Sequence, residues 1–278
     1  MKKVLSILII SVLFLVSCKD DQDILVNIHT PMGTMKVLLY DEAPLHKKNF
    51  LELAQAGKYD STIWHRVMEG FMIQGGNVFE KEGIQESPSD RIPAEFIQGL
   101  MHTKGALAAA RQPDQANPEK MSSSCQFYIV QGTVLDEQEM TVDQIALSQG
   151  LSQLLSRPEY DTIMVKFQAL AQQRKSAEMN KLALNYVDLC EKELGIKLKK
   201  DVDPERLKAY TTLGGSPHLD GEYTIFGRVV EGLDVIDKIA AVEVGRGNRP
   251  NTPVHLTMTL EPMKKKQITE KYGYKYAE

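Results

Sequence analysis

One arginine stands inside a largely apolar run, WHRVMEGFMIQGG, at residues 64–76. The guanidinium of Arg66 stays charged and presents several N–H donors in a rigid fork. No acidic residue is adjacent to it in sequence, so these donors are free to point at a substrate. A surface salt bridge with Glu69 or Glu95 is the alternative for an isolated arginine, and core packing explains each apolar neighbour taken alone.

The other reactive side chains form no catalytic or metal-binding pattern. The six histidines are scattered, and neither a CxxC pair nor any other metal-ligand spacing is present, so we expect neither a metal nor an organic cofactor. Ser122 to Ser124 lie near Lys120, but nothing in the sequence supplies the oxyanion hole that a Ser–Lys hydrolase requires. Cys125 and Cys190 could form a disulfide in an oxidising compartment or remain buried thiols.

Hydrophobic periodicity predicts mostly β-structure in the first half of the chain and again near its end. Strands are expected at 24–28, 35–40, up to His65-Arg66, 71–74, 107–110, 126–130, 224–230 and 254–260, with helices at 43–57 and 233–240. Residues 77–103 are rich in Gly, Pro, Ser and charge, which predicts a long loop. The polar residues 263–278 are expected to form a frayed tail.

The character of the sequence changes to helical between about residues 133 and 210. Apolar residues recur at helical spacing in two sets: Ile145, Leu147, Leu151, Leu154 and Leu155, then Phe167, Leu170, Ala171, Leu182, Tyr186 and Leu189. Asp203 followed by Pro204 indicates an N-cap and the first position of a further short helix. Because β-like segments resume afterwards, we interpret this block as an insertion of helices, either a working surface or a structural brace.

The N-terminus has the pattern of a secretion signal. Lys2 and Lys3 precede the apolar run 4–16, which is short for a permanent membrane-spanning helix, and LVSC follows at 15–18. This ending resembles the lipobox of bacterial lipoproteins, in which cleavage precedes a lipid-bearing cysteine. The resemblance implies a signal peptide at 1–17, lipidation of Cys18 and a polar tether at 18–23. We therefore expect a lipid-anchored protein of the cell envelope, on its periplasmic face or at the cell surface.

Four segments, in order, resemble cyclophilin-type peptidyl-prolyl isomerases. Residues 61–76 (STIWHRVMEGFMIQGG) closely resemble the family signature. Residues 104–110 (KGALAAA) resemble its Gly-x-Leu-Ser-Met-Ala segment, and residues 124–129 (SCQFYI) resemble Ser-Gln-Phe-Phe-Ile. Residues 217–229 (PHLDGEYTIFGRV) resemble its Leu-Asp-Gly…Phe-Gly-Lys-Val stretch. The similar parts cover about 24–132 and 213–260, and the helical block lies outside them.

The resemblance implies a mainly β fold with helices. It implies a closed eight-stranded antiparallel barrel capped by two helices, and the strand pattern alone does not predict that the strands close into a barrel. The domain would cover 24–262, with the helical insertion at about 133–210 and the polar tail at 263–278 after it.

The family assigns the arginine that matches Arg66 the role of hydrogen-bond donor in catalysis. The resemblance implies a set of substrate-binding residues around it: Phe71, Met72, Tyr128 and Leu219 for the proline ring, Gln74 and Gln126 for the peptide backbone, and Ala110 beside the preceding residue. Strand alternation places Phe71 opposite Met72, so a local twist or bulge would have to bring it in. His65 is expected at the pocket edge, and not as a general base, because amide rotation transfers no proton.

Several positions depart from the family pattern, among them Trp64, Ala108, Ala109 and Tyr223. Three further ones lie near the expected pocket. Tyr128 stands where many members have phenylalanine, Arg111 where many have asparagine, and His218 where cyclosporin-sensitive members have tryptophan. None of these changes removes Arg66 or Gln74, so the sequence favours an active enzyme.

The expected activity is acceleration of X-Pro rotation in exported or envelope proteins. X-Pro bonds populate both isomers and exchange over tens to hundreds of seconds, which leaves a rate to accelerate. The expected partners are proline-containing polypeptides and a membrane, reached by a monomer through the lipid on Cys18. The net charge of −4 and the lack of an extended basic face argue against nucleic acid. The alternative is a cyclophilin-like chaperone or peptide-binding module with little turnover.

Overall fold

Nine strands form one strongly curled antiparallel sheet in the computed structural model, which describes residues 21–276. They are β1 (Gln22–Thr30), β2 (Gly33–Leu39), β3 (Thr62–Ile63), β4 (Arg66–Met68), β5 (Met72–Gly75), β6 (Ala106–Ala109), β7 (Phe127–Val130), β8 (Ile225–Glu231) and β9 (His255–Lys264). Their order in the sheet is β3-β9-β1-β2-β8-β6-β7-β5-β4. The predicted signal peptide 1–17, Cys18 and the start of the tether 18–23 lie outside the described residues.

The two end strands of this sheet, β3 and β4, are consecutive in sequence. β3 pairs with β9, and the Trp64 N–H still donates to the Val254 carbonyl at 3.0 Å, whereas Arg66 pairs with Gln74 of β5. The single strand expected up to His65-Arg66 is therefore two strands, because the chain changes partners at Trp64-His65. The described pairings join no ladder between β3 and β4, so the expected closed eight-stranded barrel is a nine-stranded curled sheet.

Ten α-helices accompany the sheet in the described range. They are α1 (Pro44–Gln55), α2 (Val78–Glu82), α3 (Glu137–Thr141), α4 (Gln144–Leu154), α5 (Asp161–Gln172), α6 (Ser176–Leu184), α7 (Val187–Leu194), α8 (Pro204–Thr212), α9 (Leu233–Ala240) and α10 (Lys265–Tyr272). Short 3₁₀ helices cover Pro88–Asp90, Pro158–Tyr160, Pro217–Leu219 and Arg246–Asn248. As expected from the resemblance, two helices cap the sheet: α1 packs on β8 and β9, and α9 packs on β2, β4 and β5.

The interior of the curled sheet is filled by apolar side chains, with Phe127 at its aromatic centre. Phe127 is 1% exposed and makes edge-on contacts with Phe50, Tyr59 and Trp64 at centroid distances of 5.3, 5.6 and 5.5 Å. Such edge-to-face pairs stabilise a core beyond the area that they bury. The interior is therefore a packed core, and a binding site must lie outside it.

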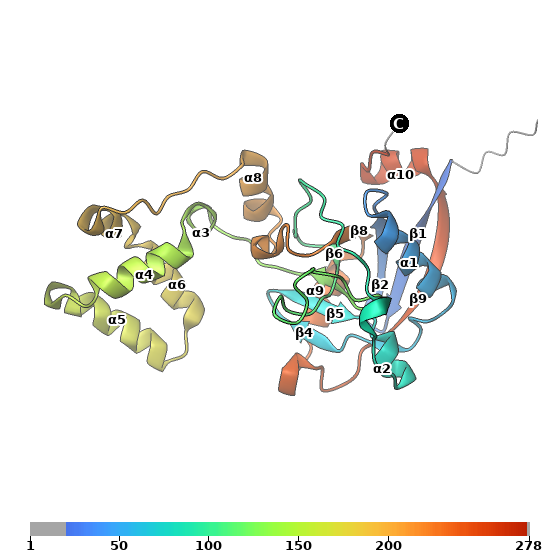
Figure 1. Cartoon of the computed structure of the whole chain (residues 1–278), viewed down its shortest axis with the longest axis horizontal. Coiled ribbons are helices and arrows are strands. Elements are labelled where there is room, and N and C mark those ends of the chain that lie inside the picture. Colours follow the sequence, from blue (N-terminus) through green and yellow to red (C-terminus); the bar gives the residue numbers. More distant parts are fainter. Residues whose placement is uncertain (1–20, 277–278) are drawn as a thin grey trace, which may run out of the picture.

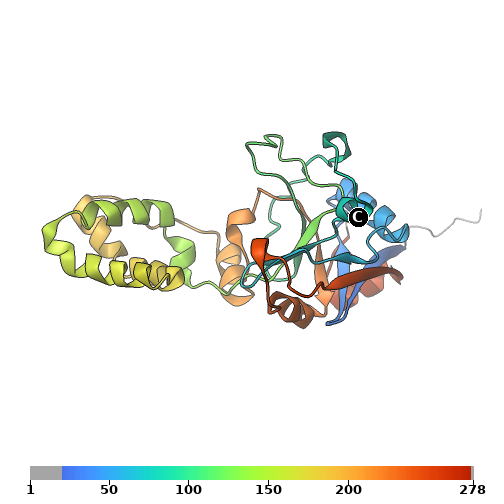
Figure 2. The ribbon, with the colours of Figure 1, turned by 90° about the horizontal axis from the view of Figure 1, so that it is seen from below.

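The predicted helical insertion is present and projects away from the sheet (Figures 1 and 2). Helices α3 to α7 form a body with a core of its own, made by Val142, Leu147, Leu151, Leu154, Leu184, Val187, Cys190 and Leu198. Helix α8 lies between this body and the sheet (Figure 1). Asp203 caps α8 by accepting from the Arg206 N–H at 2.9 Å, with Pro204 at the first helical position, as predicted.

Two expectations about packing are wrong. Ile145 is 74% exposed, because it lies about 200° around α4 from Leu147 and so faces away from the buried stripe. Residues 263–276 are not a frayed tail: β9 continues to Lys264, and α10 follows. Ile268 and Tyr274 pack on Leu25 and Leu38, two apolar side chains that the sheet leaves on its outer face.

The remaining two cysteines are both free. Cys125 lies in the core of the sheet and Cys190 in the core of the insertion, so the disulfide alternative does not apply to this structure.

Candidate active site

A row of side chains crosses four neighbouring strands on the outer face of the sheet. The register pairs Arg66 with Gln74, Gln74 with Tyr128, and Tyr128 with Ala108. Because side chains alternate along a strand, these four residues share one face. The alternate residues Val67, Ile73, Phe127 and Leu107 point into the core. Strand pairing thus places the candidate catalytic and substrate-binding groups side by side.

Two glycines fix the packing beneath this row. A Cβ on Gly75 would lie 2.9 Å from the Trp64 ring, and one on Gly76 would lie 2.5 Å from the Phe127 ring. Gly76 also has a φ of 75°, a left-handed conformation that L-residues rarely adopt. The two glycines of the sequence Gln74-Gly75-Gly76 therefore allow the Trp64 and Phe127 rings to pack closely under the strand that carries Gln74.

The outer face is hollowed beside this row, with a volume of about 300 Å³. Its lining residues are Arg66, Phe71, Met72, Gln74, Ala110, Arg111, Tyr128, His218, Leu219 and Tyr223. Phe71 reaches the hollow because it lies in the turn before β5, which begins at Met72, and so does not follow strand alternation. Seven of the residues predicted from the sequence thus meet in one place, together with Arg111, His218 and Tyr223.

Arg66 has no carboxylate partner among residues 21–276. Its guanidinium contacts neutral groups only: NH1 donates to Gln74 Oε1 at 3.3 Å, and NH2 lies 3.1 Å from Met68 Sδ. Gln74 is oriented in turn, since its Nε2 donates to Gln126 Oε1 at 3.1 Å. Gln126 does not itself line the hollow and is connected to it through Gln74. These contacts aim the guanidinium and leave its charge uncompensated by any described acid.

The two acids proposed as salt-bridge partners are placed elsewhere. Glu95 accepts from the backbone N–H groups of Leu45 and His46, each at 3.0 Å, and lies 2.6 Å from His46 Nδ1. It thereby satisfies free donors at the N-terminus of α1, where a negative charge is favourable. Glu69 lies in the turn after β4 and makes no ion pair with the described residues.

Arg111 is the contrasting arginine of the same hollow. It forms ion pairs with Asp114 and, at 3.2 Å, with Glu222, and its guanidinium stacks 4.5 Å from the Tyr223 ring centroid. Asp114 and Glu222 therefore compensate its charge, and its role is to shape one wall. Of the two guanidinium groups lining the hollow, only Arg66 has no carboxylate partner among the described residues.

A network of buried polar groups holds Tyr128 at the floor of the hollow. The sequence did not predict this network. The Tyr128 hydroxyl lies 3.0 Å from His102 Nε2, and His102 Nδ1 lies 2.9 Å from Asp220. Asp220 also accepts from the Tyr210 hydroxyl at 2.7 Å and pairs with Arg206 at 2.8 Å. With Nδ1 donating to Asp220, Nε2 is the ring nitrogen that faces the Tyr128 hydroxyl. The only sequence signal was the Leu-Asp-Gly segment that contains Asp220.

Burial and hydrogen bonding together set the protonation states of Tyr128 and Asp220. Burial raises the pKa of Tyr128 well above 10.0, so the hydroxyl remains a donor at all ordinary pH values. Burial by itself would raise the pKa of Asp220, but hydrogen bonds from His102 and Tyr210 outweigh it and leave that pKa below 3.8. Asp220 is therefore a carboxylate that ties α8 to the floor of the hollow.

His65, like Gln126, is a predicted site residue that does not line the hollow. Its Nδ1 is buried without a hydrogen-bond partner among the described residues. Burial lowers its pKa, so the ring is neutral at pH 7. The chain changes sheet partners at Trp64-His65, and this turn directs His65 away from the row that starts at Arg66.

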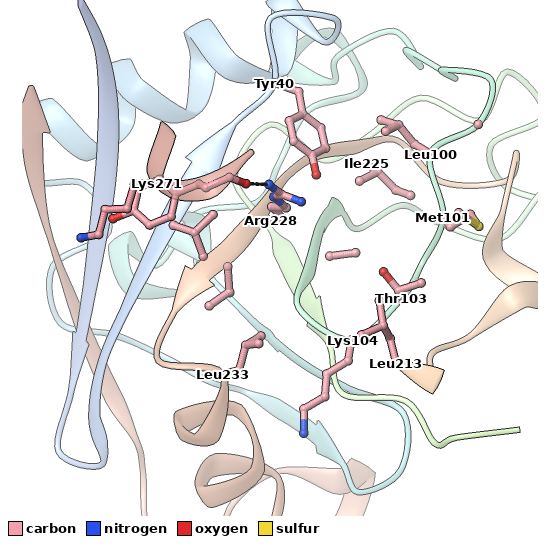
Figure 3. A pocket seen from close by; sticks show the side chains of 15 residues that line it. Tyr40, Leu100, Met101, Thr103, Lys104, Leu213, Ile225, Arg228, Leu233 and Lys271 are labelled. Atoms are coloured by element: carbon pink, nitrogen blue, oxygen red, sulfur yellow. Dashed lines mark hydrogen bonds between the residues drawn. The ribbon is translucent and has the colours of Figure 1, made fainter. Parts of the chain in front are cut away.

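A second, larger hollow of about 470 Å³ shares no lining residue with the first (Figure 3). Its cations are already engaged: Lys104 pairs with Asp237 and Lys271 with Glu231, both at 2.6 Å, and both ammonium groups reach away from the hollow (Figure 3). Arg228 donates to the Tyr272 carbonyl. We find no arrangement there that suits catalysis.

Residues 21–276 hold no group of three or more His, Cys, Asp or Glu side chains placed to bind a metal. In the same range, none of the helices has both the length and the apolar character needed to cross a bilayer.

Comparison with known proteins agrees with this geometry. A family model described as cyclophilin-type peptidyl-prolyl cis-trans isomerase matches residues 25–146 and 197–260, and the interruption falls within the helical insertion. The peptidyl-prolyl cis-trans isomerase B of Escherichia coli is 40% identical over 38% of this chain and 61% of its own length. An isomerase of Acinetobacter baylyi is 36% identical over 41% of this chain and 58% of its own length. The matches thus span less than two thirds of these relatives.

The fold is also similar to that of a solved cyclophilin-type structure. A crystal structure of a cyclophilin-type isomerase from Cryptosporidium parvum superposes with a TM-score of 0.50 at 18% identity, covering 85% of this chain and 98% of that one. At this identity the likeness concerns the fold alone. The family model, however, matches well over half of the sequence, including the strands that carry Arg66, Gln74 and Tyr128. The chain therefore belongs to the cyclophilin-type peptidyl-prolyl cis-trans isomerase family.

Proposed function

We propose that this protein accelerates cis–trans rotation of X-Pro bonds in polypeptides. The observation that carries the proposal is the Arg66 guanidinium, which lines the hollow beside the apolar side chains of Phe71, Met72 and Leu219 and has no described acid as partner. Membership of the family supports the same activity. The Cryptosporidium relative was crystallised in the presence of the dipeptide Ala-Pro, which supports proline-containing peptides as substrates.

The chemistry requires no covalent step. Resonance in the amide sets a rotation barrier of about 18–20 kcal/mol, and twisting removes the conjugation of the nitrogen. The pyramidal nitrogen then has a lone pair that accepts a hydrogen bond, which the planar ground state cannot do. A donor placed at that nitrogen therefore stabilises the transition state selectively.

Each group of the site has a part in that rotation. Phe71, Met72, Leu219 and the Tyr128 ring hold the pyrrolidine, because burying its methylenes is favourable by about 0.8 kcal/mol each. Arg66 donates to the twisted nitrogen. Gln74 keeps the guanidinium aimed and, with Gln126, offers amide groups to the peptide backbone, while the small Ala110 leaves room for the residue before proline.

The test is isomerisation of a short X-Pro peptide by the purified chain, followed as relaxation of its cis fraction. Removing one preorganised donor typically costs about 10²–10³-fold in rate, so we expect a loss of that size in Arg66→Ala. Arg66→Lys keeps the charge but loses the fork and should restore little. Arg249→Ala is the matched control, because Arg249 pairs with Glu80 at 2.8 Å and does not line the hollow. Equal rates for folded Arg66→Ala and the unaltered chain would reject the mechanism.

A second candidate function is a peptide-binding module with little turnover, favoured by the helical insertion that interrupts the family match. The same assay separates the two. Tight binding of proline peptides without acceleration by the unaltered chain would establish the module and exclude the enzyme.

We further propose that the substrates are exported or envelope proteins and that lipid on Cys18 anchors the enzyme to a membrane. The support is the LVSC sequence at residues 15–18 after an apolar run. Several acyl chains on one cysteine would hold firmly, since each buried methylene contributes about 0.8 kcal/mol. Labelled fatty acid should be incorporated by the natural chain expressed in a bacterium and not by Cys18→Ala. Labelling of both, or of neither, would refute the anchor.

A further inference from the structure

A third hollow adjoins the proline pocket and reaches the helical insertion. It measures about 580 Å³ and is lined from the sheet side by Gly70, Phe71, Thr133, Gly215, Ser216, Pro217 and His218, and from the insertion by Leu135, Glu139, Gln144, Asn180 and Leu184. Phe71 and His218 line both this hollow and the proline pocket. Their rings are stacked at a centroid distance of 5.6 Å and form the boundary between the two.

We propose that this hollow is a substrate subsite, in which the insertion binds the polypeptide segment that follows the isomerised proline. The proposal rests on the proposed isomerase function and extends it from single X-Pro bonds to longer unfolded segments. Its occupant follows from continuity: a chain that leaves the proline ring over the Phe71–His218 pair enters the hollow directly. The family resemblance assigns the residue before proline to Ala110, which lines the proline pocket but not this hollow, so the segment after proline takes this path.

The base of the hollow is held rigidly enough to act as a binding surface. The Gly215 N–H donates to the Thr133 carbonyl at 3.0 Å, and the Leu135 N–H donates to the Tyr210 carbonyl at 3.1 Å. A Cβ on Gly215 would lie 2.2 Å from the His102 carbonyl oxygen, so only glycine permits this close crossing. The polar network through Asp220 holds Tyr210 of α8 at the same junction. The insertion is thus anchored next to the site.

The lining suits an extended peptide more than a small ligand. Gln144 and Asn180 are exposed, and their side-chain amides form no hydrogen bonds with the described residues, so they can donate to and accept from a peptide backbone. Leu135 and Leu184 supply apolar surface between them. Glu139 is the only carboxylate in the lining, and burial lowers the pKa of His218, so the hollow favours neutral or basic residues over acidic ones.

The test compares three peptides with the same X-Pro core. One ends a residue after proline, one is extended by six residues after proline, and one by six residues before it; six residues span about 20 Å when extended. We expect kcat/KM for the peptide extended after proline to exceed that of the short peptide by about tenfold, or about 1.4 kcal/mol. Extension before proline should gain much less.

Substitutions in the insertion test whether it causes the higher kcat/KM of the peptide that is extended after proline. Gln144→Ala with Asn180→Ala should remove most of the long-to-short ratio, and Asn180→Trp, which fills the hollow, should do the same mainly through KM. Gln168→Ala with Asn185→Ala is the matched control, because these exposed amides of the insertion lie outside the hollow. That double variant should keep the full ratio.

The outcomes are distinguishable. If the unaltered chain does not turn over the short peptide, the proposed isomerase function fails. If it does, but the long-to-short ratio is near one, or survives Gln144→Ala with Asn180→Ala and Asn180→Trp, the subsite is refuted. A gain that arises from extension before proline would refute it equally.

Discussion

The curled sheet and the helical insertion are built on different principles within one chain. The sheet closes around large aromatic rings, with Phe127 against Phe50, Tyr59 and Trp64 and glycines beneath them. The insertion buries mainly leucines along amphipathic helices, and its core contains no residue of the sheet. The first arrangement holds the row of candidate catalytic and substrate-binding groups in strict register, and the second provides a separate surface beside it.

What joins the two regions is a small number of polar contacts. Asp220 accepts from His102, under the Tyr128 hydroxyl, and binds Tyr210 and Arg206 of α8. We therefore expect that the insertion can change without unfolding the site, provided that this junction survives.

The largest effect is expected in the core of the sheet. Phe127→Ala removes the ring against which three other aromatic side chains pack and should lower the free energy of unfolding by about 3–5 kcal/mol. Denaturant unfolding followed by tryptophan fluorescence measures this through Trp64, and isomerase activity should be lost with the fold. Val165→Ala, at a position of the insertion that is 61% exposed, is the control and should change stability little. A loss below about 1 kcal/mol for Phe127→Ala would contradict the account.

The equivalent cavity in the insertion should have a local effect. Leu154 is 0% exposed in the helical core, and Leu154→Ala should destabilise that body by about 2–5 kcal/mol. Hydrogen exchange resolved by segment should accelerate in 137–198 and remain slow in β1, β2 and β7. Turnover of a short X-Pro peptide should persist. Equal acceleration in both regions would show that they unfold as one unit.

The junction should give an intermediate effect that depends on pH. Asp220→Asn weakens the contacts to Tyr210 and Arg206 and should cost about 1–3 kcal/mol at pH 7. A carboxylate whose pKa is lowered by folding contributes stability above its unfolded pKa and loses it as the pH falls. The difference between the variant and the natural protein should therefore close as the pH falls to and below 3.8. A difference that stays constant down to pH 2 would contradict this.

The smallest effect concerns the pH dependence of activity. Burial, with a further contribution from the nearby His102, lowers the pKa of His218 below 6.5, although Asp220 opposes this. His218 is therefore neutral at pH 7, and only below pH 6.5 does a charge arise next to Phe71. Short-peptide kcat/KM should be flat from pH 7 to 9, because no proton is transferred, and should fall by less than about tenfold under more acidic conditions. His218→Gln should flatten this fall, and an identical fall in the variant would assign it to another group.

Much of the fold could be predicted from the sequence because its signals are local. Alternating apolar runs give the strands, helical spacing gives the insertion, and the motif from Trp64 to Gly76 gives the family. The same locality explains the errors. The partner change at Trp64-His65 and the packing of Ile268 on Leu25 and Leu38 both depend on neighbours that lie far away in sequence.

The residues alone predict that Arg66 stands among apolar neighbours in a strand-turn-strand motif of the cyclophilin family. That its charge has no described acid as partner depends on the fold, because Glu95 binds the N-terminus of α1 and Gln74 and Met68 contact the guanidinium instead. The same holds for the bond between His102 and Asp220, which are 118 positions apart, and for the hollow beside the insertion. The physical reason is that sequence spacing fixes which face of an element a side chain occupies, whereas its partners across elements depend on how the whole chain closes.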